Sequence, residues 1–407
     1  MKIKSILFFS CIFLLNFQTT LSQKIFITPQ PKKIIEGQKS FIISSETQIV
    51  LNDESKSIAK DLQKDFKTDF RIRLITTSYQ SLKRNFIDFK KDELLGKESY
   101  KLSISDNKII IHAKNKTGWF YGLQTLKQLC SYNSSYSKYE RTIKLKDIRI
   151  EDSPRFKWRA FMLDEARYFK GMKQVKLLLD EMAFLKMNVF HWHLVDDQGW
   201  RIEIKKYPKL TEVGAWRVDQ EDKHWDGRDE TSPDEKGTYG GFYTQDQLKD
   251  LVAYAATKNV EIIPEIEIPA HVSSAIAAYP ELSCHERPIG VPSGGVWPIT
   301  DIYCAGKEHT FEFLENVLLE VMEIFPSKYI HVGGDEATKT NWAKCADCKK
   351  RKRTEGLENV EELQSYFIKR MERFINSKGK RLIGWDEILE GGLAPEATVM
   401  SWRGVKG

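Results

Sequence analysis

The sequence predicts an α/β protein: a (β/α)8 barrel of the TIM type, preceded by a small α/β accessory domain. From Glu151 onward, strand-like segments alternate with amphipathic helical segments, as in a parallel sheet built from βα units. The side chains suited to catalysis follow the ends of these strands, where such a barrel carries its active site. An open nucleotide-binding sheet would instead carry a glycine-rich phosphate loop after its first strand, and Asp164-Glu165-Ala166-Arg167 is not one.

The length predicts more than one domain, because 407 residues exceed what one hydrophobic core usually supports. We place the accessory domain at residues 23–150 and the barrel at residues 151–407. In the accessory domain, alternating apolar and polar residues predict a β-hairpin over residues 100–113, and a helix is expected over residues 119–129.

Six strands and the helices between them are predicted for the barrel. Apolar residues at helical spacing predict helices near residues 175–185, 248–255 and 313–321, and Thr244-x-x-Gln247 forms a capping box before the second. Because a closed barrel needs eight strands, we expect this one to be incomplete at the C-terminus, with two free sheet edges. The expected strands are residues 160–166, 189–195, 260–268, 329–333, 382–385 and 398–402.

The N-terminus is typical of a secretory signal peptide. Residues 1–22 combine Lys2 and Lys4 with an apolar stretch and small polar residues, so we expect a secreted or periplasmic protein. That stretch is shorter than the roughly 20 residues of a membrane-spanning helix, and no other segment could span a bilayer. The net charge of +6, from 63 basic and 57 acidic residues, does not indicate a nucleic-acid partner. The basic run at 349–353 is better explained as a solvated helix face than as a polyanion site.

Five cysteines follow residue 22. An oxidising compartment permits disulfides, and Cys284 with Cys304 and Cys345 with Cys348 are the expected pairs. Cys345-x-x-Cys348 could also be half of a zinc site, but no second Cys or His pair stands at a suitable spacing, so no metal is predicted. Cys130 is expected to be a buried free thiol.

The most informative segment is His331-Val-Gly-Gly-Asp335-Glu336, where an apolar strand ends in two glycines and two adjacent carboxyls. A turn whose acids cap a helix is the purely structural alternative. Neighbouring strand residues point to opposite sides, which does not suit the facing acid and nucleophile of ordinary glycosidases. A pair of diverging carboxyls suits a different mechanism, in which one carboxyl protonates the leaving glycosidic oxygen and the other holds the substrate's own 2-acetamido group. We expect apolar walls and the charge of Asp335 to raise the pKa of Glu336, while Asp335 stays ionised.

Residues 190–201 bring aromatic rings, imidazoles and carboxylates together at the end of the second strand. Sugars need this mixture, because rings cover their apolar faces and charged groups bind their hydroxyls. His191 and His193 are interpreted as core histidines with satisfied hydrogen bonds rather than as metal ligands.

A second acidic cluster follows the third predicted strand. Alternation points Glu265 and Glu267 the same way, close to His271. A metal site is conceivable, but hydrolysis of a glycosidic bond needs neither metal nor cofactor, and none is expected. His271 could instead join a carboxylate relay that tunes a general acid.

Together these segments resemble the β-N-acetylhexosaminidases of glycoside hydrolase family twenty. The matches are Leu163-Asp-Glu-Ala-Arg167, residues 191–197, residues 331–336 and the two Trp-bearing strand ends, and the resemblance covers nearly all of the chain after residue 22. It implies an exo-acting enzyme that removes terminal non-reducing N-acetylglucosamine or N-acetylgalactosamine from glycans, glycoconjugates or chitooligosaccharides. The implied mechanism is retaining and substrate-assisted, through an oxazolinium intermediate.

The resemblance also implies residue roles and leaves two alternatives open. The family's last two strands normally add a Tyr, a Trp and acidic contacts that are missing here. A glycosidase for another N-acetylhexosamine-containing substrate, disaccharide-releasing or sulfated, and an inactive carbohydrate-binding fragment therefore remain alternatives. The implied roles are Glu336 as general acid/base, Asp335 as the residue that orients and stabilises the acetamido group, Asp196 with His271 as a relay to Glu336, Arg167 as the hydroxyl-binding residue, Glu267 as an acid beside the site, and Trp342, Trp385 and Trp402 as the aromatic pocket.

Overall fold

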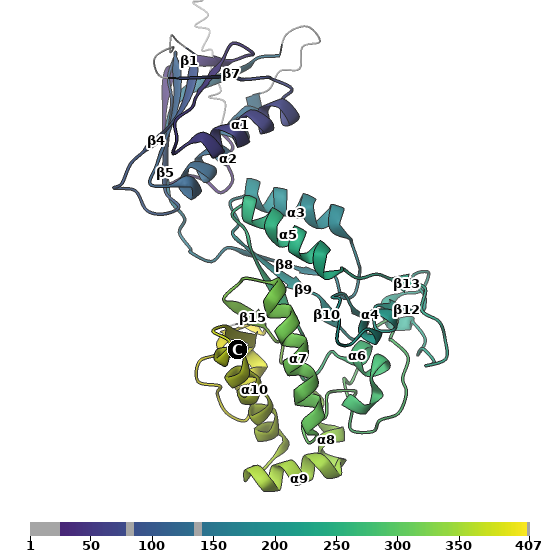
Figure 1. The fold of residues 1–407 in the computed structure, drawn as a ribbon. Helices are drawn as coiled ribbons and strands as arrows, with labels where there is room; N and C mark the ends of the chain where they lie inside the picture. The colour runs from purple at the N-terminus through teal and green to yellow at the C-terminus, as the bar shows by residue number, and fades with distance from the viewer. Residues whose placement is uncertain (1–24, 79–84, 134–140, 405–407) are drawn as a thin grey trace, which may run out of the picture.

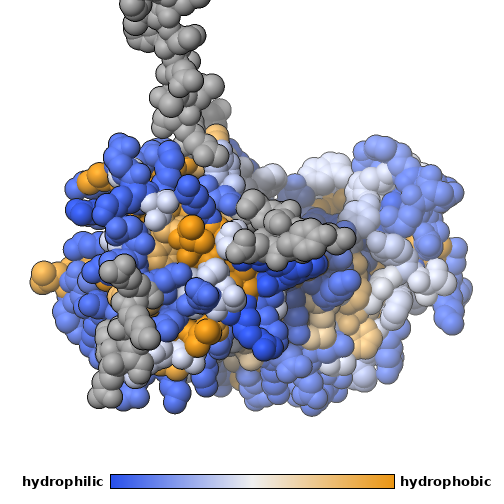
Figure 2. All heavy atoms as spheres, turned by 90° about the horizontal axis from the view of Figure 1, so that it is seen from above, coloured by the Kyte–Doolittle hydropathy of each residue, from blue (hydrophilic) through white to orange (hydrophobic). Residues whose placement is uncertain are grey.

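The computed structural model describes residues 25–78, 85–133 and 141–404, which form two separate main sheets (Figure 1). The predicted signal peptide lies outside the described residues. Within them, no helix is both long enough and apolar enough to cross a bilayer. Viewed from above, the surface is mostly hydrophilic and carries only small hydrophobic patches (Figure 2).

The first sheet belongs to the accessory domain and mixes parallel and antiparallel strands in the order β1-β7-β5-β6-β4-β2-β3. The predicted hairpin is confirmed, since β5 and β6 pair antiparallel with Tyr100 opposite Ala113. Two helices, α1 (Lys56–Asp69) and α2 (Lys116–Asn133), pack on this sheet and share its apolar core. The strands are β1 (Lys33–Ile43), β2 (Gln48–Val50), β3 (Ile75–Thr77), β4 (Phe86–Lys91), β5 (Tyr100–Ile104), β6 (Lys108–Ala113) and β7 (Ile143–Asp152).

The second sheet has six parallel strands that follow one another in sequence order, which confirms the predicted βα architecture. β8 and β17 form its two edges, so the described residues make a half-barrel. All six strands overlap the predicted segments, but five of them end two or three residues earlier than expected, and only β16 ends where predicted. The strands are β8 (Ala160–Asp164), β9 (Val189–His193), β14 (Glu261–Glu265), β15 (Tyr329–His331), β16 (Arg381–Trp385) and β17 (Thr398–Met400).

Four long helices lie between these strands: α3 (Met172–Phe184), α5 (Gln245–Thr257), α7 (Glu308–Ile324) and α10 (Val360–Ser377). They contact one another in series and bury apolar residues in the core of the half-barrel. The predicted capping box is present, because Gln247 N donates to Thr244 Oγ1 and Thr244 N donates to the Gln247 side chain.

Short elements fill the connections that follow the carboxyl ends of the strands. Arg201 is fully buried among them and donates to five backbone carbonyls, which ties these connections together. The basic run lies on α9, where Lys349, Lys350 and Arg353 are exposed as predicted, whereas Arg351 is partly buried and pairs with Glu308. The short elements are β10 (Val195–Asp196), β11 (Gly199–Trp200), α4 (Lys209–Glu212), β12 (Trp216–Arg217), β13 (Tyr239–Gly240), α6 (Ser273–Ala278), α8 (Thr340–Lys344), α9 (Ala346–Glu355) and the 3-10 helices Trp225–Gly227, Pro280–Leu282 and Asp386–Leu389.

The cysteines correct one expectation from the sequence. All five described cysteines are free thiols, and Cys130 is buried, as expected. The predicted disulfides Cys284–Cys304 and Cys345–Cys348 are wrong for this structure. Cys345 and Cys348 lie at the start of α9 and both approach the Cys304 sulfur, so Cys304 has two sulfur neighbours rather than a single disulfide partner.

Candidate active site

The Asp335-Glu336 pair lies just beyond β15, where the backbone leaves the strand conformation. Gly333 and Gly334 have φ values of 63° and 101°, and Glu336 has φ of 50°. A Cβ on Gly333 would lie 1.6 Å from Glu267 Oε2, so only glycine fits. The left-handed conformation costs a non-glycine residue roughly 1–2 kcal/mol, and such strain is typical of functional sites.

This turn overturns the expectation that the two carboxyls point to opposite sides. That argument requires a continuing strand, and here the strand has ended. Both carboxyls instead approach one imidazole nitrogen: His271 Nε2 lies 3.5 Å from Asp335 Oδ2 and 3.4 Å from Glu336 Oε2. Glu336 is the more open of the two, with 32% of its side chain exposed against 15% for Asp335.

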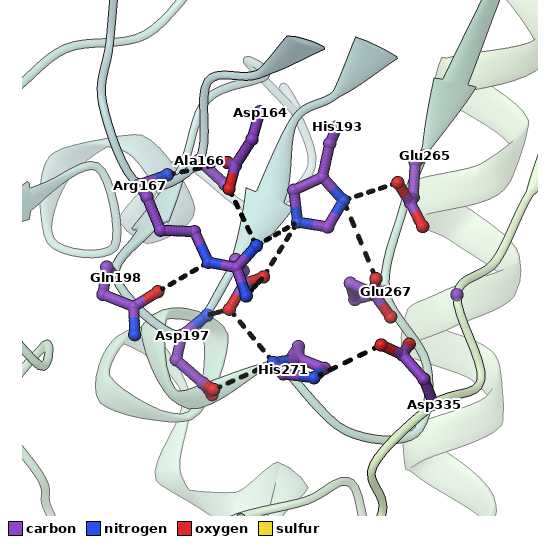
Figure 3. A network of polar contacts seen from close by, with 12 residues as sticks. Asp164, Ala166, Arg167, His193, Asp197, Gln198, Glu265, Glu267, His271 and Asp335 are labelled. Atoms are coloured by element: carbon purple, nitrogen blue, oxygen red, sulfur yellow. Dashed lines mark hydrogen bonds and ion pairs between the residues drawn. The ribbon is translucent and has the colours of Figure 1, made fainter. Parts of the chain in front are cut away.

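His271 connects these acids to a second pair of carboxylates (Figure 3). Its Nδ1 lies 3.2 Å from Asp196 Oδ1 and 3.2 Å from Asp197 Oδ2. Burial lowers the pKa of His271, but the negative charge of Asp196 and hydrogen bonds outweigh it, so the pKa lies well above 6.5. The structure thus places Asp196, His271 and Glu336 in the order that the predicted relay requires.

Arg167 lies beside this chain and is held from three directions. It donates to Asp164 Oδ2 at 2.8 Å and to Gln198 Oε1 at 3.2 Å, and its Nη2 lies 2.7 Å from Asp196 Oδ2. Burial opposes the charge of Asp196, yet His271 and Arg167 still hold the pKa of Asp196 far below its usual value. Arg167 is therefore a fixed cation at the end of β8.

Beneath these groups, Glu265 is surrounded by three histidines at the carboxyl ends of the central strands. Glu265 Oε2 lies 2.9 Å from His191 Nε2 and 2.5 Å from His193 Nδ1, and Glu265 Oε1 lies 2.9 Å from His331 Nδ1. His193 Nε2 then lies 2.8 Å from Asp196 Oδ2. Burial disfavours the charge on Glu265, but His331 and His193 outweigh it and lower its pKa.

Glu267 occupies a different environment although it is only two residues away. It is 1% exposed and neither of its oxygens makes a hydrogen bond among the described residues. Burial and then the charges of Asp335 and Glu265 raise its pKa well above 4.5. Burial and these charges therefore favour the protonated form of Glu267, which lies next to Asp335.

The pKa values of the adjacent acids reverse the expectation from the sequence. Burial raises the pKa of Asp335 to about 6, although His271 opposes it. The hydrogen bond from His271 lowers the pKa of Glu336, although burial opposes it. Without substrate, Glu336 is thus the more acidic group, because it is the more exposed of the two and its hydrogen bond with His271 outweighs burial.

The three tryptophans do not share one environment. Trp342 is fully buried, donates from Nε1 to the Tyr303 carbonyl and stacks on Phe367, so it differs from the expectation of a pocket wall. Trp385 is half-buried and its ring lies 4.8 Å from that of His331. Trp402 is 50% exposed and its Nε1 donates to Glu387. Only Trp385 and Trp402 have surface left to offer a ligand.

Three members of this network, His193, Asp197 and Glu265, were not predicted as site residues, although the sequence placed Glu265 in the acidic cluster near His271 and His193 in the core. Both histidines of the second strand are buried, and His193 has hydrogen-bond partners on both ring nitrogens, as expected. His191 differs from the expectation, because neither of its ring nitrogens makes a hydrogen bond among the described residues. The closeness of both histidines to Glu265 depends on strand register, since β14 pairs with both β9 and β15 at Glu265. The Asp196-Asp197 doublet was a visible signal for Asp197.

Comparison with known families identifies the chain. The description "Glycosyl hydrolase family 20, catalytic domain" matches residues 156–407, and "Glycosyl hydrolase family 20, domain 2" matches residues 24–153. The chain belongs to glycosyl hydrolase family 20. The resemblance inferred from the sequence motifs is thereby confirmed.

Relatives and solved structures agree with this family 20 assignment. The beta-hexosaminidase of Porphyromonas gingivalis is 42% identical over 387 residues, covering 94% of this chain and 48% of the relative. Among solved structures, β-N-acetylhexosaminidase from Bacteroides fragilis superposes with a TM-score of 0.78 at 32% identity, over 93% of this chain and 71% of that one. An exo β-N-acetylglucosaminidase from Vibrio harveyi, solved with N-acetylglucosamine, gives 0.78 at 31% identity, over 92% and 57%. The chain spans about half the length of the curated relatives it matches.

Proposed function

We propose that this protein is an exo-acting β-N-acetylhexosaminidase that hydrolyses terminal N-acetylglucosamine or N-acetylgalactosamine with retention of configuration. Its substrates are oligosaccharides or glycoconjugates, and it is exported by the predicted signal peptide. The observation that supports the proposal most directly is the convergence of Asp335 and Glu336 on His271 within 3.5 Å. Membership of family 20 supports the same reaction class.

In the first step, the Glu336 carboxyl donates its proton to the glycosidic oxygen as the bond from that oxygen to the anomeric carbon breaks. The acetamido oxygen of the same sugar forms a new bond to the anomeric carbon and closes an oxazolinium ring. The Asp335 carboxylate accepts a hydrogen bond from the acetamido N–H and stabilises the positive charge that develops there. No enzymic nucleophile is needed, because the substrate supplies one.

In the second step, the Glu336 carboxylate takes a proton from water while the water oxygen attacks the anomeric carbon. The oxazolinium ring opens, the acetamide is restored and the released sugar keeps its original configuration. Two inversions at the anomeric carbon account for the retention.

Substrate binding would reverse the order of the pKa values of Asp335 and Glu336, so that Glu336 becomes the weaker acid. The acetamido N–H next to Asp335 favours its charged form, and a sugar that covers Glu336 removes water from that carboxyl and raises its pKa. The proton then belongs to Glu336 in the complex. Asp196 and Asp197 hold His271, and the hydrogen bond between His271 and Glu336 can strengthen or weaken as Glu336 loses and regains its proton.

The test is hydrolysis of two chromogenic β-glycosides that differ only at the second carbon, one with a 2-acetamido group and one with a 2-hydroxyl. We expect turnover of the first and at least about a thousandfold lower kcat/KM for the second, because the second lacks the internal nucleophile. A thiazoline analogue of the cyclised intermediate should inhibit competitively. Equal turnover of both glycosides would contradict the mechanism, and binding without turnover would indicate a carbohydrate-binding protein instead.

A further inference from the structure

Four cysteine sulfurs meet at one point in the connections that follow β14 and β15. Cys284 and Cys304 come from the first connection, and Cys345 and Cys348 come from the start of α9 in the second. The Sγ–Sγ distances are 3.7 Å for Cys284–Cys348, 3.8 Å for Cys304–Cys345 and 3.6 Å for Cys304–Cys348. All four sulfurs lie within 4.8 Å of one another.

These distances fit four ligands of one ion better than two disulfides. A disulfide holds its sulfurs about 2.05 Å apart. A tetrahedral zinc site with Zn–S bonds of about 2.3 Å places its sulfurs about 3.8 Å apart. Cys304 and Cys348 each have two sulfur neighbours at nearly equal distances, whereas a disulfide gives each cysteine a single partner.

The surroundings of the four sulfurs also suit thiolates. Cys304 and Cys348 are fully buried, and the Gly306 N–H donates to the Cys304 sulfur. A Cβ on Gly306 would lie 2.3 Å from Cys348 N, so the glycine lets the Cys304 turn approach α9 closely. Cys345 and Cys348 occupy the N-terminal turn of this ten-residue helix, where the helix dipole favours negative charge.

We propose that Cys284, Cys304, Cys345 and Cys348 bind one structural zinc ion. Four cysteine ligands leave no open position for water or substrate, which is characteristic of a structural rather than a catalytic zinc site. Binding releases the thiol protons to solvent and requires no oxidant. The sequence did not reveal this site, because the second cysteine pair is separated by a 19-residue loop rather than by a short knuckle.

The zinc ion would join the two connections that carry the candidate catalytic residues. His271 begins the first connection, and Asp335 and Glu336 begin the second. Hydrogen bonds already cross between them, because Trp342 Nε1 donates to the Tyr303 carbonyl and Thr338 N donates to the Ile299 carbonyl. A metal ion next to these contacts would fix the position of His271 relative to Asp335 and Glu336 without touching substrate.

Metal content of the full chain, purified without metal-affinity resin, tests the proposal. Mass spectrometry of the metals should find about one zinc ion per chain. Cys304→Ser and Cys348→Ser should lose most of it, whereas Cys130→Ser, which changes a buried thiol of the accessory domain, should keep it. A chelator should also lower the Tm of the wild type and leave that of Cys348→Ser unchanged, because metal binding is coupled to folding.

If the variants fail to fold, a thiol measurement on the wild type still distinguishes zinc-bound thiolates from disulfides and from free thiols without metal. A mercurial reagent should release zinc to a colorimetric chelator, and alkylation after denaturation without reductant should label all four cysteines. Two disulfides in place of free thiols would overturn the proposal, as would four free thiols without metal. Iron at one ion per chain would overturn the assignment of zinc.

Discussion

The two sheets of this protein bury very different side chains. The core of the accessory domain is mainly apolar, and its buried polar residues include a single carboxylate among the described residues, Asp88 on β4. In the half-barrel, the carboxyl ends of β9, β14 and β15 bury His191, His193, Glu265 and His331, each at most 3% exposed. Buried ionisable groups cost free energy unless they are paired. Buried ionisable groups therefore gather in the half-barrel, where we propose the chemistry, and not in the accessory core.

The largest effect is expected from Glu336→Gln. The amide cannot donate or accept the proton that the two steps require, so kcat should fall by roughly a hundredfold to ten-thousandfold. Steady-state kinetics on the chromogenic 2-acetamido glycoside measure the loss. Added azide should not restore turnover, because no enzymic nucleophile has been removed.

Glu323→Gln is the matched control for this variant, since Glu323 is an exposed residue of α7. It should retain wild-type kcat. If Glu336→Gln kept more than a tenth of wild-type turnover, Glu336 would not be the general acid.

Glu265→Gln tests the buried polar network directly. Burial lowers the pKa of His193, but Glu265 and Asp196 outweigh it and raise that pKa to about 10. The neutral amide would remove the Glu265 counter-charge of His193, and breaking a buried ion pair costs about 3–5 kcal/mol. Denaturant unfolding should show this loss. Activity should also fall, because His193 positions Asp196 and Asp196 positions His271.

Leu126→Ala is the corresponding change in the accessory core, where Leu126 is fully buried. It should cost about 2–5 kcal/mol of stability through the cavity it leaves, with kcat of the folded enzyme unchanged. Equal activity in both variants would show that the network in the half-barrel is structural only.

The pH dependence of kcat/KM reports the free enzyme. Burial raises the pKa of Asp335 to about 6, although His271 opposes it. The productive free enzyme carries one proton on the two acids, because Glu336 must be protonated and Asp335 charged once substrate is bound. Above about pH 6 the free enzyme loses that proton, so kcat/KM should fall about tenfold per pH unit above this pH. Asp335→Asn should lower kcat/KM and shift this basic limb to lower pH, because the proton is then lost from Glu336, whose pKa is lowered. A wild-type profile that stays flat from about pH 5 to about pH 8 would contradict the shared proton.

The smallest effect is expected from Thr244→Ala, which removes the cap of α5 outside the polar network. The loss should be about 1 kcal/mol of stability, with unchanged kcat. Thr257→Ala, at an exposed position near the other end of α5, serves as the control and should change stability by less than about 0.5 kcal/mol. A loss of turnover in Thr244→Ala would mean that the helices behind the sheet also position the site.

Much of the fold was predictable because it depends on local periodicity. The hairpin of the accessory domain, the six strands and the capping box of α5 are all encoded by neighbouring residues. The gathering of Asp196, His271, Glu267 and the Asp335-Glu336 pair was also predictable, since parallel strands end at the same edge of their sheet.

The sequence by itself determined the order of βα units and which residues follow the strand ends, because both follow from periodicity along the chain. Only the tertiary structure decided that Asp335 and Glu336 converge on His271 and that Glu265 lies close to three histidines. It also decided that Trp342 is buried and that the sulfurs of four cysteines lie close together. Those outcomes depend on strand register, on backbone turns at Gly333 and Gly334, and on contacts between loops far apart in sequence. No local pattern records such distances, because they are set by how the whole chain packs.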